Sequence, residues 1–352
     1  MMQGVIQKLV SGEGLKPEEA RAAMEEIMSG RATPAQIAAF LVALRMKGET
    51  VTEITEFAKV MREFSVRINP RVGGRIVDTC GTGGDASHTI NVSTVSALVS
   101  SAAGAVVAKH GNRAVSSSSG SADVLEALGV NIQAPPEVVQ RCIEDVGIGF
   151  LFAPTFHPAM KNALAPRREI GVRTVFNILG PLTNPAGASA QLLGVYSNDL
   201  LEKMAEALKR LGVMPAAVVH GSGLDEITNT GETDILWISE EGEVSREALT
   251  PEELGVRRAK LEELKVRSRE EGCVEVFKLL YTPEKVAEAK RDIVLLNSAA
   301  VLVVAGEAQG MEEGMEMARE ALASGRAYQK LKGLVKSSGG DPGRLEELES
   351  KA

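Results

Sequence analysis

Ile76-Val77-Asp78-Thr79-Cys80-Gly81-Thr82-Gly83-Gly84-Asp85 is a short apolar run that ends in three glycines within four positions. Such a run predicts a strand at Ile76–Thr79, and closely spaced glycines let the following loop turn tightly against a ligand. A helix is expected soon afterwards, at Ser93–Ala103, and its free N-terminal N–H groups favour an anion. The order strand, glycine loop, helix therefore predicts an α/β unit that holds a phosphate. A plain strand-to-helix turn explains the glycines alone equally well.

Short apolar runs alternate with helical stretches beyond this unit. Strands are expected at Ile76–Thr79, Val106–Lys109, Ile148–Phe152, Leu192–Tyr196, Ala217–His220 and Ile235–Ile238. Further helices are expected at Ala122–Leu128, Pro136–Val146, Asp199–Leu211 and Pro283–Val304, with a solvated helix or tail at Arg344–Ala352. Alternating strands and helices are typical of an α/β domain with a mixed, mainly parallel central sheet.

The first seventy residues carry helix signals instead. Pro17 opens one amphipathic segment, and the pairs Thr33/Gln36 and Thr50/Glu53 form capping boxes for two more. We therefore expect a small N-terminal helical domain over residues 1–72 and a larger α/β domain over 73–352. The helical segment within residues 158–186 does not fit the strand–helix alternation, and it could join the N-terminal helices.

The overall composition argues against some classes of binding partner. Thirty-nine Lys and Arg residues against 47 Asp and Glu residues give a net charge of −8, which offers no general attraction to nucleic acid. The N-terminus lacks a signal-peptide pattern, and the most apolar run, Ile293–Gly306, is too short to span a membrane. Three widely spaced cysteines fit a reducing compartment, so we expect a cytoplasmic protein that does not bind membranes.

A second polar loop reinforces the first. Lys109-His110-Gly111-Asn112-Arg113-Ala114-Val115-Ser116-Ser117-Ser118-Ser119-Gly120-Ser121 also follows a strand and precedes a helix. Its arginine can fork onto phosphate oxygens and its lysine can act as a point charge, although either cation alone is most simply a solvated surface residue. In the first loop, Thr89, Asn91, Ser93 and Thr94 add more donors than one helix cap needs. Two such loops at strand ends predict one shared anionic ligand.

Asp225 and Glu226 follow the strand that ends at His220, so we expect them at the same edge of the sheet. Adjacent carboxylates are usually only solvated. A ligand with several phosphates, however, generally needs Mg²⁺, which takes one or two carboxylates together with phosphate and water oxygens. We therefore assign these two acids to a metal. Arg167 reads as a solvated helix end, and no histidine has metal-site spacing or a paired nucleophile.

Together, these motifs resemble the anthranilate phosphoribosyltransferase family. The likeness spans nearly the whole chain and includes Ser119–Gly129 and Arg173–Pro185. It implies a fold like that of nucleoside phosphorylases and phosphoribosyltransferases, homodimerisation through the helical part, and a place in tryptophan biosynthesis. It also implies transfer of the phosphoribosyl group from 5-phosphoribosyl 1-pyrophosphate (PRPP) to the amine of anthranilate, with Mg²⁺, two ions per subunit.

The resemblance also implies roles for individual residues. PRPP would contact Gly81, Gly84, Asp85, Thr89, Asn91, Val92, Ser93, Thr94, Lys109, His110, Gly111, Asn112, Arg113, Ala114, Val115, Ser116, Ser117 and Ser121. The metal would contact Ser93, Asp225 and Glu226. Anthranilate would contact Gly81, Asn112 and Arg167, and its route would be lined by Ala153, Pro154, His157 and Met160. In this interpretation Arg167 binds the carboxylate of anthranilate.

Two positions depart from the family pattern, and two other functions stay open. Ser118 stands where the family often has a lysine or arginine, and Ile90 stands where an aromatic residue is common. We expect these departures to change affinity and not to abolish activity. The alternatives are a pyrimidine nucleoside phosphorylase-like enzyme, which would use free phosphate, and a non-catalytic relative that binds nucleic acid. No acid or base is assigned to the reaction, and Lys109 and Arg113 are given an electrostatic role.

Overall fold

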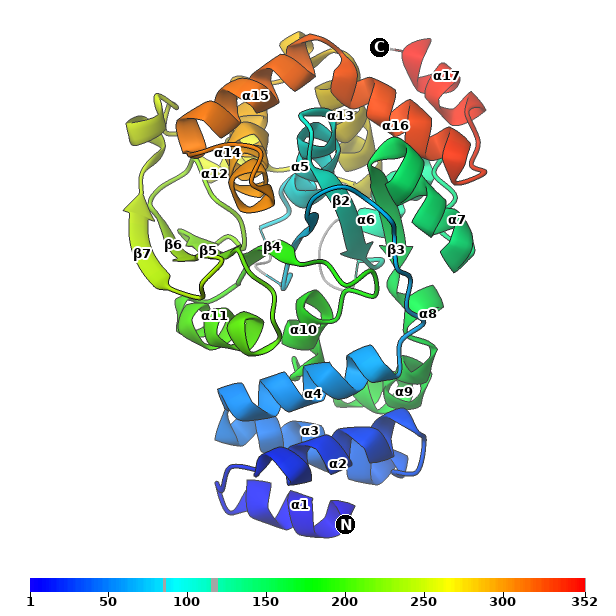
Figure 1. Cartoon of the computed structure of the whole chain (residues 1–352), viewed down its shortest axis with the longest axis vertical. Coiled ribbons are helices and arrows are strands. Elements are labelled where there is room, and N and C mark those ends of the chain that lie inside the picture. Colours follow the sequence, from blue (N-terminus) through cyan, green and yellow to red (C-terminus); the bar gives the residue numbers. More distant parts are fainter. Residues whose placement is uncertain (85–86, 115–119, 352) are drawn as a thin grey trace.

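The computed structural model describes residues 1–84, 87–114 and 120–351. Four helices lie together at one end of the molecule, at the bottom of Figure 1: α1 (Met2–Val10), α2 (Pro17–Met28), α3 (Pro34–Lys47) and α4 (Val51–Glu63). The last three are the expected helices, and α1 lies outside the expected set. A later helix, α9 (Lys161–Ile170), packs against α2 and α3, and the Asn162 side-chain amide donates to Met28 O at 2.9 Å.

Both expected capping boxes form. The Thr33 hydroxyl accepts from Gln36 N at 3.3 Å, and the Gln36 side chain accepts from Thr33 N at 3.0 Å. Thr50 and Glu53 make the same reciprocal pair at 3.2 and 2.8 Å. Because Glu53 is fully buried, its carboxylate also accepts from Leu15 N at 2.9 Å. One capping residue thus joins the start of α4 to the segment before α2.

A seven-stranded sheet forms the centre of the larger lobe, in the order β3-β2-β1-β4-β5-β6-β7. The first five strands in this order are parallel, and β6 and β7 pair antiparallel at one edge. The bounds are β1 (Ile76–Gly81), β2 (Val106–Gly111), β3 (Ile148–Phe152), β4 (Ala190–Gly194), β5 (Ala216–Gly221), β6 (Thr233–Ile238) and β7 (Val244–Leu249). The expected α/β class with a mixed, mainly parallel sheet is confirmed.

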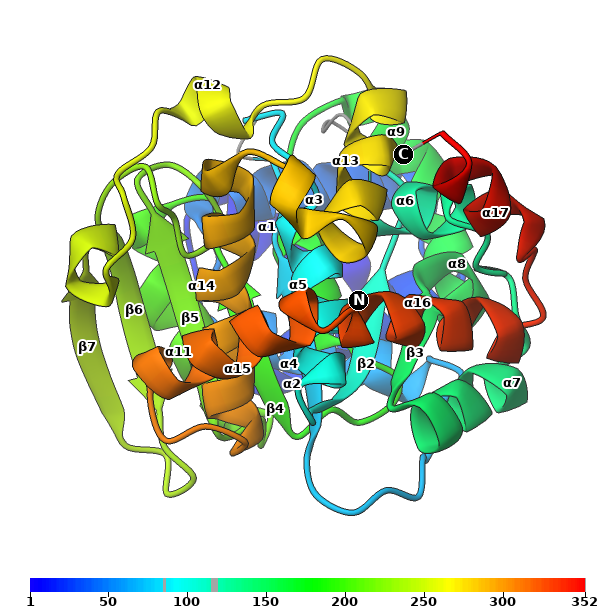
Figure 2. The same cartoon turned by 90° about the horizontal axis from the view of Figure 1, so that it is seen from above.

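Helices cover both faces of this sheet (Figures 1 and 2). One face meets α5 (Val92–Ala102), α14 (Glu288–Ala305) and α16 (Arg326–Ser337), and α15 (Met311–Ala323) packs on α14 and α5. On the opposite side, toward α4, lie α10 (Phe176–Leu179) and α11 (Leu201–Arg210). Alternate strand residues explain the two sides: Leu192 and Ala217 belong to the core under α14, and Leu193 and Val218 to the core shared with the helical lobe. The remaining helices are α6 (Ser121–Ala127), α7 (Pro136–Arg141), α8 (Ala153–Phe156), α12 (Leu261–Leu264), α13 (Arg269–Tyr281) and α17 (Gly343–Glu349).

Two expected elements differ from the structure. The helix expected at Pro283–Val304 is interrupted, because a 3₁₀ turn at Pro283–Lys285 is followed by extended backbone at Val286 before α14 begins. β4 begins two residues earlier than expected, at Ala190. The longest described helix has 18 residues, and none in the described ranges is long and apolar enough to cross a bilayer.

Candidate functional site

Four of the five parallel strands end in glycine. Gly81, Gly111, Gly194 and Gly221 are the last residues of β1, β2, β4 and β5. Because parallel strands end at the same edge, the loops that follow them converge there. A side chain at any of the four would collide with a neighbouring segment: with Asp225 at Gly81 and Gly194, with Glu226 O at Gly221, and with Ser121 of α6 and Phe150 of β3 at Gly111. We call this edge the glycine rim.

The Asp225–Glu226 loop lies directly on the glycine rim. A tight turn after β5 begins it, in which Gly221 and Leu224 exchange backbone hydrogen bonds of 2.9 Å. Gly83 N in the first loop donates to Asp225 Oδ2 at 2.6 Å. Asp225 is only 8% exposed, so this bond counts among the strong charge-assisted ones. The structure therefore joins two segments that are 142 residues apart in the sequence.

Asn297 of α14 anchors the acidic loop from beneath. Its Oδ1 accepts from Ile227 N at 3.0 Å, and its Nδ2 donates to Ile227 O at 2.7 Å. Asn229 makes a further bond to the same helix, from Nδ2 to Ala289 O at 2.8 Å. The sequence carried a signal for this anchor, since Asn297 interrupts the most apolar run of the chain. A fully buried amide needs partners, and this one fixes the backbone beside the two acids.

Lys109 lies at the base of the first loop. It is 3% exposed, and its Nζ donates to Thr79 O at 2.8 Å and to Ser93 Oγ at 3.1 Å. Burial lowers the pKa of Lys109, while Asp78 and Glu226 oppose that shift. Ser93 is the second residue of α5, so the lysine charge and the positive end of the helix dipole lie side by side. This is a buried, positively polarised corner next to the glycine rim.

Asp78 is a buried carboxylate whose negative charge opposes the positive charge of Lys109. It is fully buried in β1, and its Oδ1 accepts from His110 N at 3.2 Å. Burial raises its pKa to about 6, against the lowering effects of Asn184, Lys109 and backbone N–H groups. Asp78 had no role in the sequence interpretation, although it stands in the first quoted segment.

His110 and His157 form a buried pair, with ring centroids 5.0 Å apart. Burial lowers the pKa of His110 to about 3, with a smaller effect from His157, and burial lowers the pKa of His157 to about 4. Both rings are therefore neutral at pH 7. The Nε2 atoms of both have no hydrogen-bond partner among the described residues. His110 thus contributes an uncharged surface to the loop in which Lys109 carries the charge.

Arg113 is directed toward acids of its own loop region. Its guanidinium bonds both oxygens of Glu126, at 2.7 and 2.9 Å, and Asp123 Oδ1 at 3.1 Å. These acids raise the pKa of Arg113, Glu126 most strongly. Asp123 is 2% exposed and also accepts from Ala114 N at 2.9 Å and from Gly120 N at 3.0 Å. The arginine expected on phosphate therefore pairs with two acids of α6.

Asn112 and Ser121 close the same loop. Asn112 O accepts from Ala122 N at 3.2 Å and from Ser121 Oγ at 3.5 Å, and its side-chain oxygen accepts from Arg113 N at 2.8 Å. Ser121 is the first residue of α6, and Gly111 allows the serine hydroxyl to approach β2. These contacts bring both ends of the loop together at the glycine rim.

The segment before α5 has its own support. Asn91 caps α5, because its Oδ1 accepts from Thr94 N at 3.2 Å, and Val92 and Thr94 are buried. Thr89 forms an isolated bridge with Lys265, and Ile90 N donates to Leu264 O at 3.2 Å. Ile90 is 3% exposed, so it serves the core and not the site surface.

Arg167 lies apart from these contacts, on α9. Its guanidinium stacks on the Phe176 ring at 5.1 Å, and burial lowers its pKa. Within the described ranges no carboxylate lies within ion-pair distance of it. A partly desolvated arginine of this kind suits a carboxylate ligand. Met160 and Ala159 pack nearby in the helical core, and the bounds of α8 include Ala153 and Pro154.

Asp85, Val115, Ser116 and Ser117, together with Ser118, lie outside the described residues. Sequence reasoning also missed Arg173, which contacts Gly84 O with its guanidinium. This arginine stands within Arg173–Pro185, so the signal was a cation shortly after α9.

The donor set fits Mg²⁺. Ser93, Asp225 and Glu226 offer only oxygen atoms, which hard divalent cations prefer, and a carboxylate 8% exposed favours a cation nearby. In the described part of the chain no three His, Cys, Asp or Glu side chains form a complete metal cage. A cation here would thus share its coordination with substrate and water oxygens, as Mg²⁺ does beside phosphates.

Comparison with known proteins agrees with this geometry. Residues 73–328 match the Glycosyl transferase family, a/b domain, and residues 3–65 match the Glycosyl transferase family, helical bundle domain. The anthranilate phosphoribosyltransferase of Geobacter sp. (strain M21) is 51% identical over 349 residues, covering 95% of this chain and 98% of that protein. That of Thioalkalivibrio sulfidiphilus is 53% identical over 335 residues, covering 95% and 98%.

Solved structures agree as well. The crystal structure of anthranilate phosphoribosyltransferase from Thermus thermophilus has 47% identity and a TM-score of 0.89, covering 95% of this chain and 99% of that one. The enzyme from Saccharomyces cerevisiae in complex with PRPP and Mg has 28% identity and a TM-score of 0.87, covering 96% and 98%. This chain belongs to the anthranilate phosphoribosyltransferase family.

Proposed function

We propose that the glycine rim is where this enzyme transfers the phosphoribosyl group of PRPP to the amine of anthranilate, in tryptophan biosynthesis. One observation carries the proposal: the Gly83–Asp225 bond of 2.6 Å joins the glycine loop to the acidic loop, next to Lys109 and Ser93. A phosphate loop, a buried cation and a pair of acids at one edge form a site for a sugar diphosphate with its metal.

The donor contacts follow from this arrangement. PRPP would lie along both loops, against Gly81, Gly84, Thr89, the Asn91–Thr94 segment and Lys109–Ala114, with Ser121 at the far end and with Asp85, Val115, Ser116 and Ser117. Ser93, Asp225 and Glu226 would hold Mg²⁺, with two ions per subunit. Anthranilate would contact Gly81, Asn112 and Arg167.

The reaction is a displacement at C1 of the ribose. The aryl amine is neutral at pH 7 and carries its own lone pair, so the chain needs no strong base. Lys109 Nζ and the first N–H groups of α5 would oppose the negative charge that develops on the leaving pyrophosphate. Bound Mg²⁺ would supply further positive charge against that leaving group. Because Lys109 is fixed by Thr79 O and Ser93 Oγ, its charge is already positioned before the reaction.

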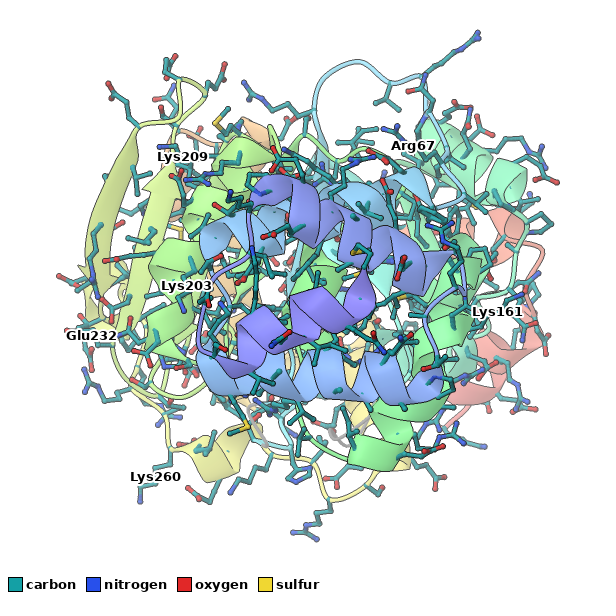
Figure 3. All side chains as sticks on the ribbon, turned by 90° about the horizontal axis from the view of Figure 1, so that it is seen from below. Arg67, Lys161, Lys203, Lys209, Glu232 and Lys260 are labelled. Atoms are coloured by element: carbon teal, nitrogen blue, oxygen red, sulfur yellow. The ribbon has the colours of Figure 1, made fainter. Side chains whose placement is uncertain are left out.

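The division of the chain and its assembly belong to the same proposal. We infer a boundary near residue 72, with α9 serving the N-terminal helices, and a cytoplasmic homodimer formed through the helical lobe. Val10, Met46 and Leu164 support this, since these apolar side chains in the lobe are 73%, 83% and 51% exposed. Figure 3 views this end, where the labelled Lys161 and Lys209 lie toward the edges of the view. Light scattering should give twice the 37.3 kDa chain mass.

Anthranilate fluorescence tests the function. The protein is incubated with PRPP, Mg²⁺ and anthranilate, and we expect the fluorescence to fall, and to stay constant when a chelator is added. Asp225→Ala and Glu226→Ala should each lower metal-dependent turnover, by about 10²-fold. Glu232→Ala, an exposed acid labelled in Figure 3, is the control. Constant fluorescence at high enzyme concentration would reject the reaction, and an unchanged Mg²⁺ titration would reject the metal assignment.

A further inference from the structure

We propose that Arg173 is a positioning residue that couples the two substrate sites, so that binding at the phosphate loop improves binding of the acceptor at Arg167. This inference rests on the proposed function of the glycine rim. It assigns a role to a residue that the donor and acceptor contacts above do not include.

Arg173 contacts two of the loops that meet at the glycine rim. Its guanidinium donates to Gly84 O, and its central carbon lies 4.5 Å from the centroid of the Tyr196 ring. Tyr196 follows β4, and its own N donates to Thr82 Oγ1 at 3.1 Å. Arg173 is therefore also linked, through Tyr196, to Thr82 of the phosphate loop, two residues before Gly84. The four residues Thr82, Gly84, Arg173 and Tyr196 form a closed ring of contacts around the loop.

Gly84 is shaped for this arginine. A Cβ at Gly84 would collide with the Arg173 guanidinium, and the glycine has φ +84°, a conformation that other residues rarely adopt. The Gly84 carbonyl accepts from the Arg173 guanidinium. A loop that moved without Arg173 would give up this bond.

The other side of Arg173 leads to the acceptor arginine. Residues 171–175 are the short link between α9 and α10. Both ends of the link are fixed: Gly171 N donates to Arg167 O at 3.4 Å, and Thr174 N donates to Asn177 Oδ1 at 2.9 Å. Arg167 also stacks on Phe176, the first residue of α10. Arg167 and Arg173 therefore belong to one locally stiff unit.

Coupling follows from these two sets of contacts. A pyrophosphate group bound at the Gly83–Gly84 loop would act on Arg173 through Gly84 O, and Arg173 would act on the segment that carries Arg167. The acceptor then meets an arginine that is already oriented. By linkage the effect is reciprocal, so bound acceptor must tighten the binding of pyrophosphate by the same factor.

A lysine cannot replace Arg173 in this role. The guanidinium plane stacks on the Tyr196 ring while its edge donates to Gly84 O, and an ammonium group offers no plane to stack. The charge alone is therefore insufficient, which separates this proposal from a general attraction between Arg173 and phosphate.

The test measures the affinity of the purified protein for anthranilate by fluorescence, without and with saturating pyrophosphate and Mg²⁺, which do not react with it. The ratio of the two dissociation constants is the coupling factor. We expect about 5-fold or more for the unmodified protein. Arg173→Gln and Tyr196→Leu should bring the factor close to 1, and the double variant should be no worse than either. Arg173→Lys should keep only part of the coupling.

Arg168→Gln is the matched control, because Arg168 is the exposed neighbour of Arg167 on the same helix. It should keep the full coupling factor. Circular dichroism and thermal unfolding show whether each variant is folded, and Arg173→Lys provides a second reading if the glutamine variant is not. Retained coupling in the Arg173 variants overturns the inference, as does an equal loss of both affinities with an unchanged ratio. A protein that fails to use PRPP and anthranilate at all instead contradicts the proposed function.

Discussion

Lys109 and Arg113 are two cations of the same loop, yet the structure treats them in opposite ways. Lys109 is 3% exposed and is held by Thr79 O and Ser93 Oγ. The Arg113 side chain is 40% exposed and is held by two carboxylates of α6. One cation is fixed in position before any ligand arrives. The other is held by ion pairs that a competing anion can replace.

This difference would suit the two cations to different roles in the proposed reaction. A buried charge with fixed hydrogen bonds needs no reorganisation during the reaction, which makes Lys109 suited to stabilise a leaving group. An exposed ion pair is worth little, so Arg113 can leave Glu126 at small cost when a better anion arrives. Asp123 keeps its bonds to Ala114 N and Gly120 N after such an exchange.

Replacing the buried cation should have the largest effect. Lys109→Met removes the positive charge that opposes Asp78 and faces Ser93, so we expect kcat/KM to fall by about 10³-fold, or about 4 kcal/mol. Steady-state kinetics measure the change. Lys161→Met, at an exposed lysine of α9, should leave kcat/KM within about 2-fold. An Lys109→Met protein with near-normal kcat would show that the fixed charge is not used in the reaction.

The pH dependence of folding stability should show the next largest effect, at a buried side chain. The pKa of His157 is about 4 when folded, below the ordinary value of 6.5, so its stabilising contribution is complete above pH 6.5 and is lost as the pH falls toward 4. The free energy of unfolding, measured with urea, should therefore fall between pH 7 and pH 5. This fall should be about 2 kcal/mol smaller in His157→Gln than in the unmodified protein.

Asp78 titrates in the opposite sense. Its pKa is raised to about 6, so its contribution falls as the pH rises, but it is common to both proteins and cancels in the difference. His110 remains in the variant, so the loss of stability caused by its protonation at low pH is the same in both proteins. The same substitution at His88, which is exposed, is the control. An equal pH dependence in the His157→Gln and unmodified proteins would mean that His157 is not buried in its neutral form.

Removing the exposed cation should affect binding more than turnover. Arg113→Gln should raise the KM for PRPP by about 10-fold, or about 1.4 kcal/mol, with kcat within about 3-fold. Arg319→Gln removes a comparable exposed ion pair, with Glu316, and should change neither constant. If kcat fell and the KM for PRPP did not change, Arg113 would act in the reaction step as Lys109 is proposed to do. The proposed difference between the two cations would then be wrong.

The smallest effect should come from the competing acid. Glu126→Gln frees Arg113 from its bidentate partner, so the KM for PRPP should fall, by about 2- to 5-fold at low ionic strength. Salt screens exposed charges, so the gain should shrink above about 0.1 M. Glu316→Gln is the matched exposed control. A raised KM in Glu126→Gln would instead mean that Glu126 orients Arg113 toward PRPP.

Much of the sheet was predictable because its strands are apolar runs that end in glycine or at a turn. Ile148–Phe152 has the expected bounds. β4 begins earlier than expected because Gln191 reads as polar, although it is 2% exposed and donates to Pro181 O at 2.7 Å. β7 was missed because its residues from Val244 to Ala248 are exposed, so this edge strand has no apolar pattern.

Capping boxes marked α3 and α4, but α13 was missed although the Ser268 hydroxyl caps it by accepting from Glu271 N. α15 lacks a side-chain cap, but its buried residues Met315, Ala318 and Leu322 do follow helical spacing, so a signal was present. The two loops and the acidic pair were singled out from the sequence, and the structure brings Gly83 and Asp225 together. The pairing of Arg113 with Glu126 was not, because both lie in a polar stretch and only the folded backbone decides which acid an arginine meets.

The glycine ends of β1, β4 and β5 bear on any attempt to transplant this site. Asp225 and Glu226 approach the sheet so closely that a single methyl group at Gly81, Gly194 or Gly221 would push them away. On another parallel sheet that lacks these glycines, the two acids would therefore lie too far from the strand ends. The proposed metal site would depend on three strand ends as much as on two carboxylates, so a designer would have to copy the three glycines together with the two acids.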